Sequence, residues 1–530
     1  MVSTVLNEPV QSMPVPCAEQ PSSVATEEKR SYGQILKSSA MIGGSQVLNI
    51  AIGIGRTKAL AMLLGPGGFG LASLYNSIAE LTQNIAGLGI NSSGVRQIAE
   101  AVGSQEEKRI SLTVAVLRRT SLLLGLVGAL VLVVFCRQIS IVTFGTAKYW
   151  SGVAALAIVA FCKLVSGAQG ALIQGMRRVS DLAKMNALGA LFGAMVSVGL
   201  VYVFREKGII PYLVAIAAMG LLMSWWYSHK IAIAIPHVTR AQVGQEARAL
   251  LKLGIAFMIS SMMTLGVAYA IRIIVLRKVG LAGTGLYQSA WTLGGMYVTF
   301  ILQAMGADFY PRLTAHINDH PTSNRLVNEQ AHVGLLLATP GIIGTLTFAP
   351  LVIATLYSAK FGGSVPILRW ICLGTMVQVI TWPMGFIIIA KGRQNLFIFC
   401  EIAWAVVTLV LTWVCVAHFG LSGTGIAFFL SYVFHGILLY PIVMHLTEFS
   451  WSKDNVVSGF ICLSAIALVF YSLYVLPSLA ATALGILIAL CMTIYSLRRL
   501  LKVVSMHDLP VPLRRLLVTL RVHNLLSSEI

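Results

Sequence analysis

Charged side chains inside long apolar stretches are the residues of this sequence that most clearly could bind a ligand or take part in chemistry. Those stretches contain the cations Arg56, Lys58, Lys163, Arg272 and Arg369 and the acids Glu80 and Glu401. A charge in the middle of a membrane-spanning helix costs roughly 2.5–3.5 kcal/mol on the insertion scale, so each needs a partner, a wet cavity or access to the headgroups. Fixed cations at this depth favour an anionic cargo, because guanidinium groups match phosphate oxygens in bidentate geometry.

Some of these cations have a simpler explanation. Lys58 and Arg272 lie near the expected external ends of their stretches, from which both can reach the headgroups. Arg56 and Lys163 lie deeper. Arg56 and Lys58 point about 200° apart on an ideal helix, so both can line one cavity only if the helix unwinds near residues 53–55, where two glycines permit it.

Polar residues also form a stripe on one predicted helix. Its members are Asn76, Glu80, Gln83 and Asn84. They share one helical face, which indicates either a wet surface or polar contacts between helices. In the matching helix of the second half, Gln288 lies beside Tyr287 and Trp291, a part-amide, part-aromatic surface suited to sugar rings. We expect Arg56, Lys58, Lys163, Arg272, Glu80 and Gln288 to contact substrate, and Glu80 or Glu401 to carry a coupling proton or sodium ion. His435 is isolated, and we expect it to be hydrogen-bonded to a neighbour.

Composition indicates the elements that hold these residues. The chain has 530 residues, of which 57% are hydrophobic and 11% charged, against about a quarter charged in soluble domains. Continuous apolar stretches of roughly 20 residues predict membrane-spanning helices. We expect about fourteen, at residues 38–63, 70–90, 114–135, 153–174, 187–204, 212–229, 253–276, 285–306, 334–356, 365–389, 396–416, 425–444, 457–476 and 480–497. The fold class is therefore an all-α polytopic membrane protein.

A glycine motif reveals a duplication. Residues 65–71 (GPGGFGL) reappear as 280–286 (GLAGTGL), and a third copy stands at 420–426 (GLSGTGI). The copies predict tight turns in which glycine adopts positive φ and helices approach closely. Since 65 to 280 is 215 positions, about six spans, we expect two six-helix lobes that run in the same direction, related by a pseudo-two-fold axis along the membrane normal.

These observations predict five units. They are a disordered cytoplasmic tail (1–33), a first lobe (34–235), a second lobe (236–447), an extra two-helix hairpin (448–499) and a basic cytoplasmic tail (500–530). Most of the 38 Lys and Arg residues fall on the side that holds both ends. The positive-inside rule therefore places both termini in the cytoplasm. The net charge of +19 follows from this topology and from contact with anionic membrane lipids, and no nucleic acid is expected as a partner.

Several classes of function are disfavoured. The eight cysteines show no CxxC spacing, so neither a disulfide framework nor a metal site is expected. No nucleophile–base pair, carboxylate dyad or nucleotide-binding motif can be assembled, and we expect neither catalysis nor a cofactor. The external loops are too short for a glycan polymerase or ligase.

Short motifs in a fixed order resemble a known family. The segments are 65–71, 85–90 (IAGLGI), 267–269 (VAY), 285–288 (GLYQ) and 307–313 (ADFYPRL). Over residues 34–447 the chain resembles the O-antigen flippases, Wzx-type polysaccharide translocases of the multidrug/oligosaccharidyl-lipid/polysaccharide exporter superfamily. Relatives place a basic residue where Lys58 stands, and they commonly have twelve spans. The hairpin and the long N-terminal tail are departures from that pattern.

The resemblance implies a function. It is translocation of an undecaprenyl-diphosphate-linked oligosaccharide, an O-antigen or exopolysaccharide repeat unit, across the bacterial inner membrane. Basic residues would line a central cavity, the lobes would rock in alternating access, and a glycan polymerase and chain-length regulator would be further partners. The alternatives are a cation-coupled small-molecule exporter of the same superfamily, which calls for a mainly acidic cavity, and a non-transporting scaffold of a glycan-assembly complex.

Overall fold

The protein is described by a computed structural model that covers residues 21–104, 106–231 and 240–503. Every regular element in these ranges is a helix. The first helix starts at Pro21, so helical structure begins within the segment predicted to be a disordered tail. Residues 1–20 and 504–530, which hold the rest of both predicted tails, lie outside the described ranges.

The first lobe contains seven α-helices. They are α1 (Pro21–Gly87), α2 (Ile90–Gly103), α3 (Glu107–Val134), α4 (Cys136–Phe144), α5 (Trp150–Gly175), α6 (Val179–Phe204) and α7 (Ile209–His229). The second lobe and the hairpin follow. They are α8 (Arg240–Ala315), α9 (His320–Thr347), α10 (Ala349–Leu356), α11 (Val365–Ala390), α12 (Gln394–Phe419), α13 (Gly423–Thr447), α14 (Lys453–Val475) and α15 (Ser478–Val503). Short 3-10 segments join some of them, at Ala147–Tyr149, Arg205–Gly208, Ala359–Ser364 and Gly420–Ser422.

The helices are long and apolar enough for a multi-pass membrane protein. Among the described residues, eight helical stretches could each cross a membrane, or up to ten if each of two bent pairs is one span. Three of the stretches, of 42, 51 and 54 residues, exceed what one crossing needs. Each of these three contains a turn, at Gly65, at Arg205–Gly208 or at Gly420–Ser422. Those turns fall between pairs of predicted spans, which reconciles the stretches with the larger number of crossings expected.

The repeated glycine motif forms the same turn in both lobes. Gly65 interrupts α1 with φ 65° and ψ −176°, and Gly280 interrupts α8 with φ 86° and ψ −179°. Gly420, in the third copy, also has a positive φ of 57°. Only glycine adopts this backbone without steric cost. The turns predicted from the motif are therefore confirmed, and they divide α1 and α8 each into two antiparallel segments.

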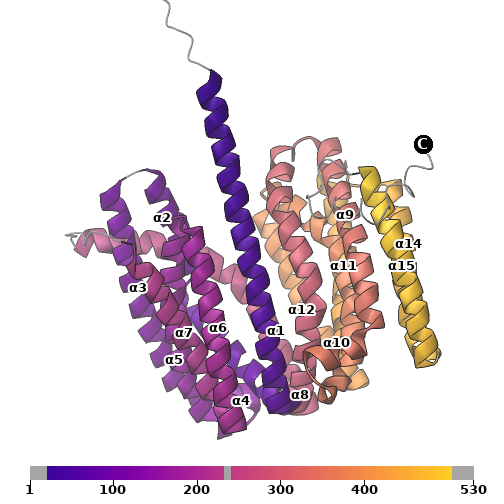
Figure 1. Ribbon diagram of the computed structural model, residues 1–530, viewed down its shortest axis with the longest axis horizontal. Helices are drawn as coiled ribbons and strands as arrows, with labels where there is room; N and C mark the ends of the chain where they lie inside the picture. Colours follow the sequence, from indigo (N-terminus) through magenta and orange to yellow (C-terminus); the bar gives the residue numbers. More distant parts are fainter. Residues whose placement is uncertain (1–20, 105, 232–239, 504–530) are drawn as a thin grey trace, which may run out of the picture.

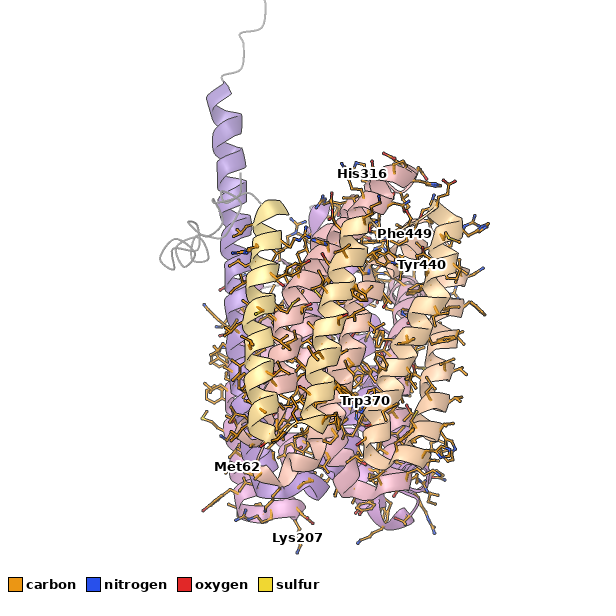
Figure 2. The ribbon with its side chains drawn as sticks, turned by 90° about the vertical axis from the view of Figure 1, so that its right-hand side faces the viewer. Met62, Lys207, His316, Trp370, Tyr440 and Phe449 are labelled. Carbon is orange, nitrogen blue, oxygen red and sulfur yellow. The ribbon has the colours of Figure 1, made fainter. Side chains whose placement is uncertain are left out.

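Two groups of helices stand side by side (Figure 1). Helices α2–α7 form one group and α9–α13 the other; α1 runs between them, and α8 extends from the first group to the second. The hairpin α14–α15 packs on α9, at the outside of the second lobe. We call the end of the molecule with the Gly65 and Gly280 turns the turn end. Figure 2 shows Met62 and Lys207 at this end and His316 and Phe449 at the opposite one.

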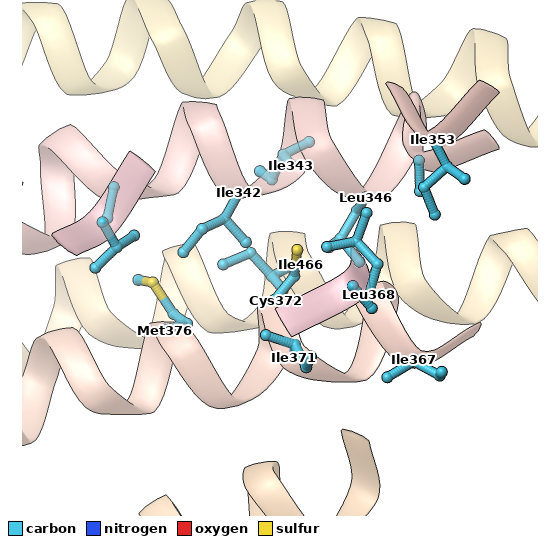
Figure 3. Close-up of a cluster of buried hydrophobic side chains, with 14 of the residues drawn as sticks. Ile342, Ile343, Leu346, Ile353, Ile367, Leu368, Ile371, Cys372, Met376 and Ile466 are labelled. Atoms are coloured by element: carbon cyan, nitrogen blue, oxygen red, sulfur yellow. The ribbon is translucent and has the colours of Figure 1, made fainter. Parts of the chain in front are cut away.

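Buried aliphatic side chains hold the helices of the second lobe together. Leu368, Ile371 and Met376 of α11 pack in one cluster with Ile342 of α9 and Ile466 of α14 (Figure 3). The hairpin thus shares a core with the second lobe. Within a membrane, close packing rather than water release supplies the attraction between helices.

The two lobes meet at the turn end through glycines. A Cβ atom added at Gly70 would lie 2.8 Å from the backbone nitrogen of Gly285, and one added at Gly285 would lie 3.0 Å from that of Gly70. Each glycine also faces a backbone carbonyl of the other turn, that of Leu281 or that of Pro66. The contact is reciprocal, as a pseudo-two-fold axis requires. The repeat therefore packs against itself.

Side chains extend this closure. Phe69 makes edge-on contacts with Tyr357 and Phe361, with ring centroids 5.6 and 5.8 Å apart. The Arg277 guanidinium donates to the carbonyls of Ile141 and Val142, at 2.8 and 2.7 Å. These carbonyls lie in the last turn of α4, where a cation also interacts favourably with the helix dipole. The turn end is thus closed by both apolar and polar contacts.

Candidate functional site

A polar chain crosses the interior of the first lobe. The Lys163 ammonium of α5 donates to Asn76 Oδ1 at 3.0 Å, and Asn76 Nδ2 donates to Glu80 Oε1 at 2.7 Å. Lys163 also interacts electrostatically with Glu80 and with Arg56. Asn76 and Glu80 are one turn apart on the second segment of α1, so both face α5. Three residues predicted to form the site are therefore brought together: Arg56, Lys163 and Glu80.

Arg56 and Lys58 do not share a cavity. Gly65 is the one residue within α1 whose backbone departs from helical geometry, so the helix is regular at residues 53–55 and is not unwound there. Arg56 is half-buried and interacts electrostatically with Tyr212 of α7, whereas Lys58 is exposed. The condition for both cations to line one cavity is not met, because two residues apart on a regular helix they face nearly opposite ways.

In the second lobe, Arg272 and Gln288 are partners. Arg272 Nε donates to Gln288 Oε1 at 2.8 Å, and its Nη1 donates to the Ala268 carbonyl at 3.0 Å. The amide of Gln288 continues the chain to Thr292 Oγ1, at 3.1 Å. Arg272 thus lies about two helical turns before Gly280, as Arg56 lies about two helical turns before Gly65. The structure places both predicted residues in one polar chain near the turn end.

Two adjoining polar cavities lie beside the first-lobe chain. The first-lobe cavity, of about 640 Å³, is lined by Lys163 and by polar residues of α2, α5 and α6. The junction cavity, of about 480 Å³, lies between the first lobe and α8 and is lined by Glu80, Asn84 and Ser261. Both cavities are lined by Gln83, Asn91 and Ser92. The polar stripe predicted on one helix therefore faces a cavity between lobes, and Ser261 bridges to it by donating to Asn84 Oδ1 at 2.7 Å.

A third cavity, of about 330 Å³, lies in the second lobe, and we call it the second-lobe cavity. It is lined by Thr264, Gln378, Thr381, Trp382, Gly385, Phe386, Ile389, Phe397, Cys400, Glu401, Trp404, Tyr432, His435 and Leu439. Thr264 of α8 also lines the junction cavity, so the three cavities adjoin one another across both lobes. Glu401 is half-buried here, far along the chain from Glu80.

Two predicted features lie elsewhere. Tyr287 is only 3% exposed and belongs to the second-lobe core, with Trp291 packed edge-on against Phe428 at 5.3 Å between ring centroids. The aromatic part of the surface predicted around Gln288 is therefore core packing. Arg369 lies over the Tyr474 ring of the hairpin, 5.9 Å from its centroid, and so faces α14.

Sequence reasoning missed the aromatic lining of the second-lobe cavity. Glu401 and Trp404, three residues apart on α12, face Tyr432 and His435, three apart on α13. Matching i, i+3 polar–aromatic pairs on neighbouring helices were the available signal. The expected hydrogen bond of His435 is not found for one ring nitrogen: Nδ1 is buried without a partner in the described part of the chain.

The fold and these cavities define a class of protein. Two like-oriented helical lobes with polar cavities within and between them are the architecture of a multi-pass membrane transporter. The chain belongs to the family described as polysaccharide biosynthesis protein, whose model matches residues 59–366. This match spans more than half of the chain and includes the turns at Gly65 and Gly280.

Known proteins support this assignment. The chain is 24% identical over 417 residues to the lipid III flippase of Escherichia coli strain K12, covering 75% of this chain and 95% of that protein, and equally to that of Shigella flexneri. Its fold resembles that of the lipid II flippase MurJ in an inward closed conformation (TM-score 0.65, 13% identity, covering 87% of this chain and 100% of that one). It also resembles an inward-facing multidrug resistance MATE transporter of the MOP superfamily (TM-score 0.58, 14% identity, covering 77% and 96%). The fold is thus that of the superfamily indicated by the motifs.

Proposed function

We propose that this protein flips an undecaprenyl-diphosphate-linked oligosaccharide, an O-antigen or exopolysaccharide repeat unit, across the bacterial inner membrane by alternating access. One observation carries the proposal. Lys163, with Arg56 in electrostatic reach, lines a polar cavity inside the membrane-spanning part of the first lobe that opens onto the junction cavity. This arrangement presents fixed positive charge to a headgroup that enters between the lobes.

Electrostatics explains why such a cargo needs these residues. An isolated anion transferred into a low-dielectric medium is strongly disfavoured, and a nearby fixed cation offsets that cost. Lys163 supplies an ammonium and Arg56 a guanidinium that can hold phosphate oxygens in bidentate geometry. Arg272, near the turn end in the second lobe, offers a further cation on the way out. The polyprenyl tail stays in the lipid while the head passes between the lobes.

The closed turn end fits a state that is loaded from the opposite side. We assign the turn end to the periplasmic face, because the basic loops and both termini then lie in the cytoplasm, in agreement with the positive-inside rule. Opening the reciprocal Gly70–Gly285 contact, together with closure at the other end, would release the head outward. We propose residues 34–235 and 236–447 as the rocking lobes.

Relatives support the class of cargo. The two curated relatives are named lipid III flippases and the matched structure with a TM-score of 0.65 is a lipid II flippase. The family description, polysaccharide biosynthesis, supports a glycan as the cargo. A glycan polymerase and a chain-length regulator are the proposed partners, and the hairpin α14–α15 gives them an added surface. Glu80, linked through Asn76 to Lys163, and Glu401 are the proposed coupling residues.

Loss of surface glycan tests the proposal. The double variant Arg56→Gln, Arg272→Gln should abolish surface glycan in cells while membrane levels of the protein stay normal. Lys58→Gln, on the same helix as Arg56 but exposed, is the matched control and should retain glycan. Normal surface glycan in the double variant would refute the role of the two arginines.

A second candidate is a cation-coupled small-molecule exporter, which the resemblance to the MATE transporter favours. The acids Glu80 and Glu401 line cavities that such a cargo could use. The two candidates differ in a vesicle assay with purified protein. A flippase moves a fluorescent polyprenyl-diphosphate glycan between leaflets, whereas an exporter moves a lipophilic cation such as ethidium. Movement of ethidium alone would replace our proposal with the second candidate.

A further inference from the structure

The second-lobe cavity has an aromatic lining that the proposed diphosphate site does not use. The Trp404 ring lies 5.7 Å from that of Tyr432 and 6.2 Å from that of His435, measured between centroids. On the facing helix α11, the Trp382 and Phe386 rings are 4.6 Å apart. Aromatic faces stack well on the apolar faces of sugar rings, and their polar edges can bind hydroxyl groups. The cavity thus combines stacking surfaces with polar groups.

Two buried polar atoms in this cavity have no partner. Trp404 Nε1 and His435 Nδ1 are inaccessible and make no hydrogen bond with the described residues. Buried polar groups are nearly always paired, so a ligand or a water molecule that turns the two rings toward the cavity would satisfy both atoms. The Glu401 carboxylate and the Gln378 amide line the same space. Together they offer both acceptors and donors.

The donor chemistry decides which ligand fits. The indole nitrogen of Trp404 can only donate, so its partner must carry a lone pair. A sugar hydroxyl can accept from that nitrogen, and a hydroxyl of the same ring can donate to the Glu401 carboxylate. An organic cation without a lone pair would leave Trp404 unpaired. The volume of about 330 Å³ lies at the lower end of the range for small-molecule sites, about 300–1,000 Å³, so it suits one sugar ring rather than a chain.

We propose that the second-lobe cavity binds the sugar next to the diphosphate, with Trp404 as the stacking platform and Glu401 as the hydroxyl acceptor. The inference rests on the proposed function and deepens it. Thr264 lines both this cavity and the junction cavity, which in turn adjoins the cavity of Lys163. A headgroup whose diphosphate lies in the junction cavity, near the chain Glu80–Asn76–Lys163, can therefore place the attached sugar in the adjoining second-lobe cavity.

Binding of short-chain probes tests this division. Purified full-length protein in nanodiscs is titrated with citronellyl diphosphate and with the same lipid diphosphate bearing glucose, galactose or N-acetylglucosamine. In the wild type, at least one sugar should raise the affinity over the sugarless probe. In Trp404→Leu that gain, which we expect to be about tenfold, should disappear, while the sugarless probe binds as before. Glu401→Gln should reduce the gain without changing the size of the side chain.

A matched control lies on the same helix. Trp413 of α12 is 52% exposed, and Trp413→Leu should keep the full gain. The inference is overturned if the gain in affinity survives in Trp404→Leu or if no sugar produces a gain. It is also overturned if Trp404→Leu weakens the binding of a lipophilic cation, tetraphenylphosphonium, and leaves the binding of every sugar probe unchanged. Lys163→Met separates the two proposals, since it should weaken all diphosphate probes. If the Lys163→Met variant binds the sugarless probe as tightly as the wild type does, the proposed phosphate site is wrong, whatever the result for Trp404→Leu.

Discussion

The two lobes share a backbone plan but differ in what lines their cavities. Both contain a glycine turn with nearly the same dihedral angles, at Gly65 and Gly280. Both also carry an arginine about two helical turns before that glycine. The first lobe presents Lys163 and amide side chains, whereas the second presents aromatic rings with one carboxylate. Duplication has therefore kept the residues that the turn and the lobe contact require, while the linings have diverged. A cargo with two chemically distinct parts is the simplest reason for such divergence.

The largest expected effect concerns the cation of the first lobe. Lys163→Met keeps most of the length of the side chain but removes its charge and its hydrogen bond to Asn76, so we expect flipping in vesicles to fall by more than about tenfold, which corresponds to about 1.4 kcal/mol or more. Lys163→Arg should recover part of the rate because it restores the charge. If Lys163→Met flips normally, the charge asymmetry between the lobes has no role in transport.

The next effect concerns what the lobes have in common. Gly70→Ala or Gly285→Ala places a methyl group against the backbone of the other turn, and overpacking of this kind costs about 1–3 kcal/mol. The closed turn end should become less populated. Thr284→Cys, buried at the turn end in the wild type, then reports opening through maleimide labelling in an otherwise cysteine-free protein, and labelling should rise severalfold.

A control glycine exists for this test. A Cβ atom at Gly199 of α6 would meet nothing within 4 Å, so Gly199→Ala should leave the labelling unchanged. Equal labelling in all three alanine variants would show that the glycine contact does not hold the lobes together.

A smaller effect is expected from the polar part of the same closure. Arg277→Gln removes the charged donor to the carbonyls of Ile141 and Val142. Because Arg277 is exposed, water replaces part of what is lost, and we expect a rise in Thr284→Cys labelling below that of the glycine variants. Lys278→Gln tests the neighbouring cation, which lies over Trp413 and not over α4. It should change labelling least. A larger effect in Arg277→Gln than in Gly285→Ala would make the arginine the main closing contact.

The smallest effect is expected at Lys58. Its side chain is exposed and faces away from Arg56. Flipping by Lys58→Gln should stay within about twofold of the wild type, a change of about 0.4 kcal/mol. A loss as large as that of Arg56→Gln would mean that α1 unwinds during transport, as the two glycines at positions 53 and 55 would allow.

Much of the fold could be predicted because its determinants are local. Apolar length identifies the spans, and the glycine motif predicts the positive φ found at Gly65, Gly280 and Gly420. Only part of the hydrogen-bonded series Lys163–Asn76–Glu80 could be predicted. The one-turn spacing of Asn76 and Glu80 can be read from the sequence, but their contact with Lys163 on α5 cannot. The direction of Lys58 depended on whether α1 stays regular, which composition cannot decide.

The aromatic residues illustrate the limit most clearly. Tyr287 and Trp291 lie on the helix that matches the polar stripe, yet they pack in the core, while Trp404 and Tyr432 line a cavity. All four occur in apolar stretches of similar character. Whether a ring meets another helix or an open space depends on how α11, α12 and α13 cross, and this is a property of their tertiary packing that the residues around each ring do not determine.

The meeting of Gly70 with Gly285 has one more implication. Atoms of the main chain alone make this contact, so no proton binds there, no ion screens it and no rotamer must be frozen when it forms. The strength of this one contact then depends on shape and is insensitive to acidity and salt. Closure between the two glycines would therefore stay the same when the surrounding solution changes.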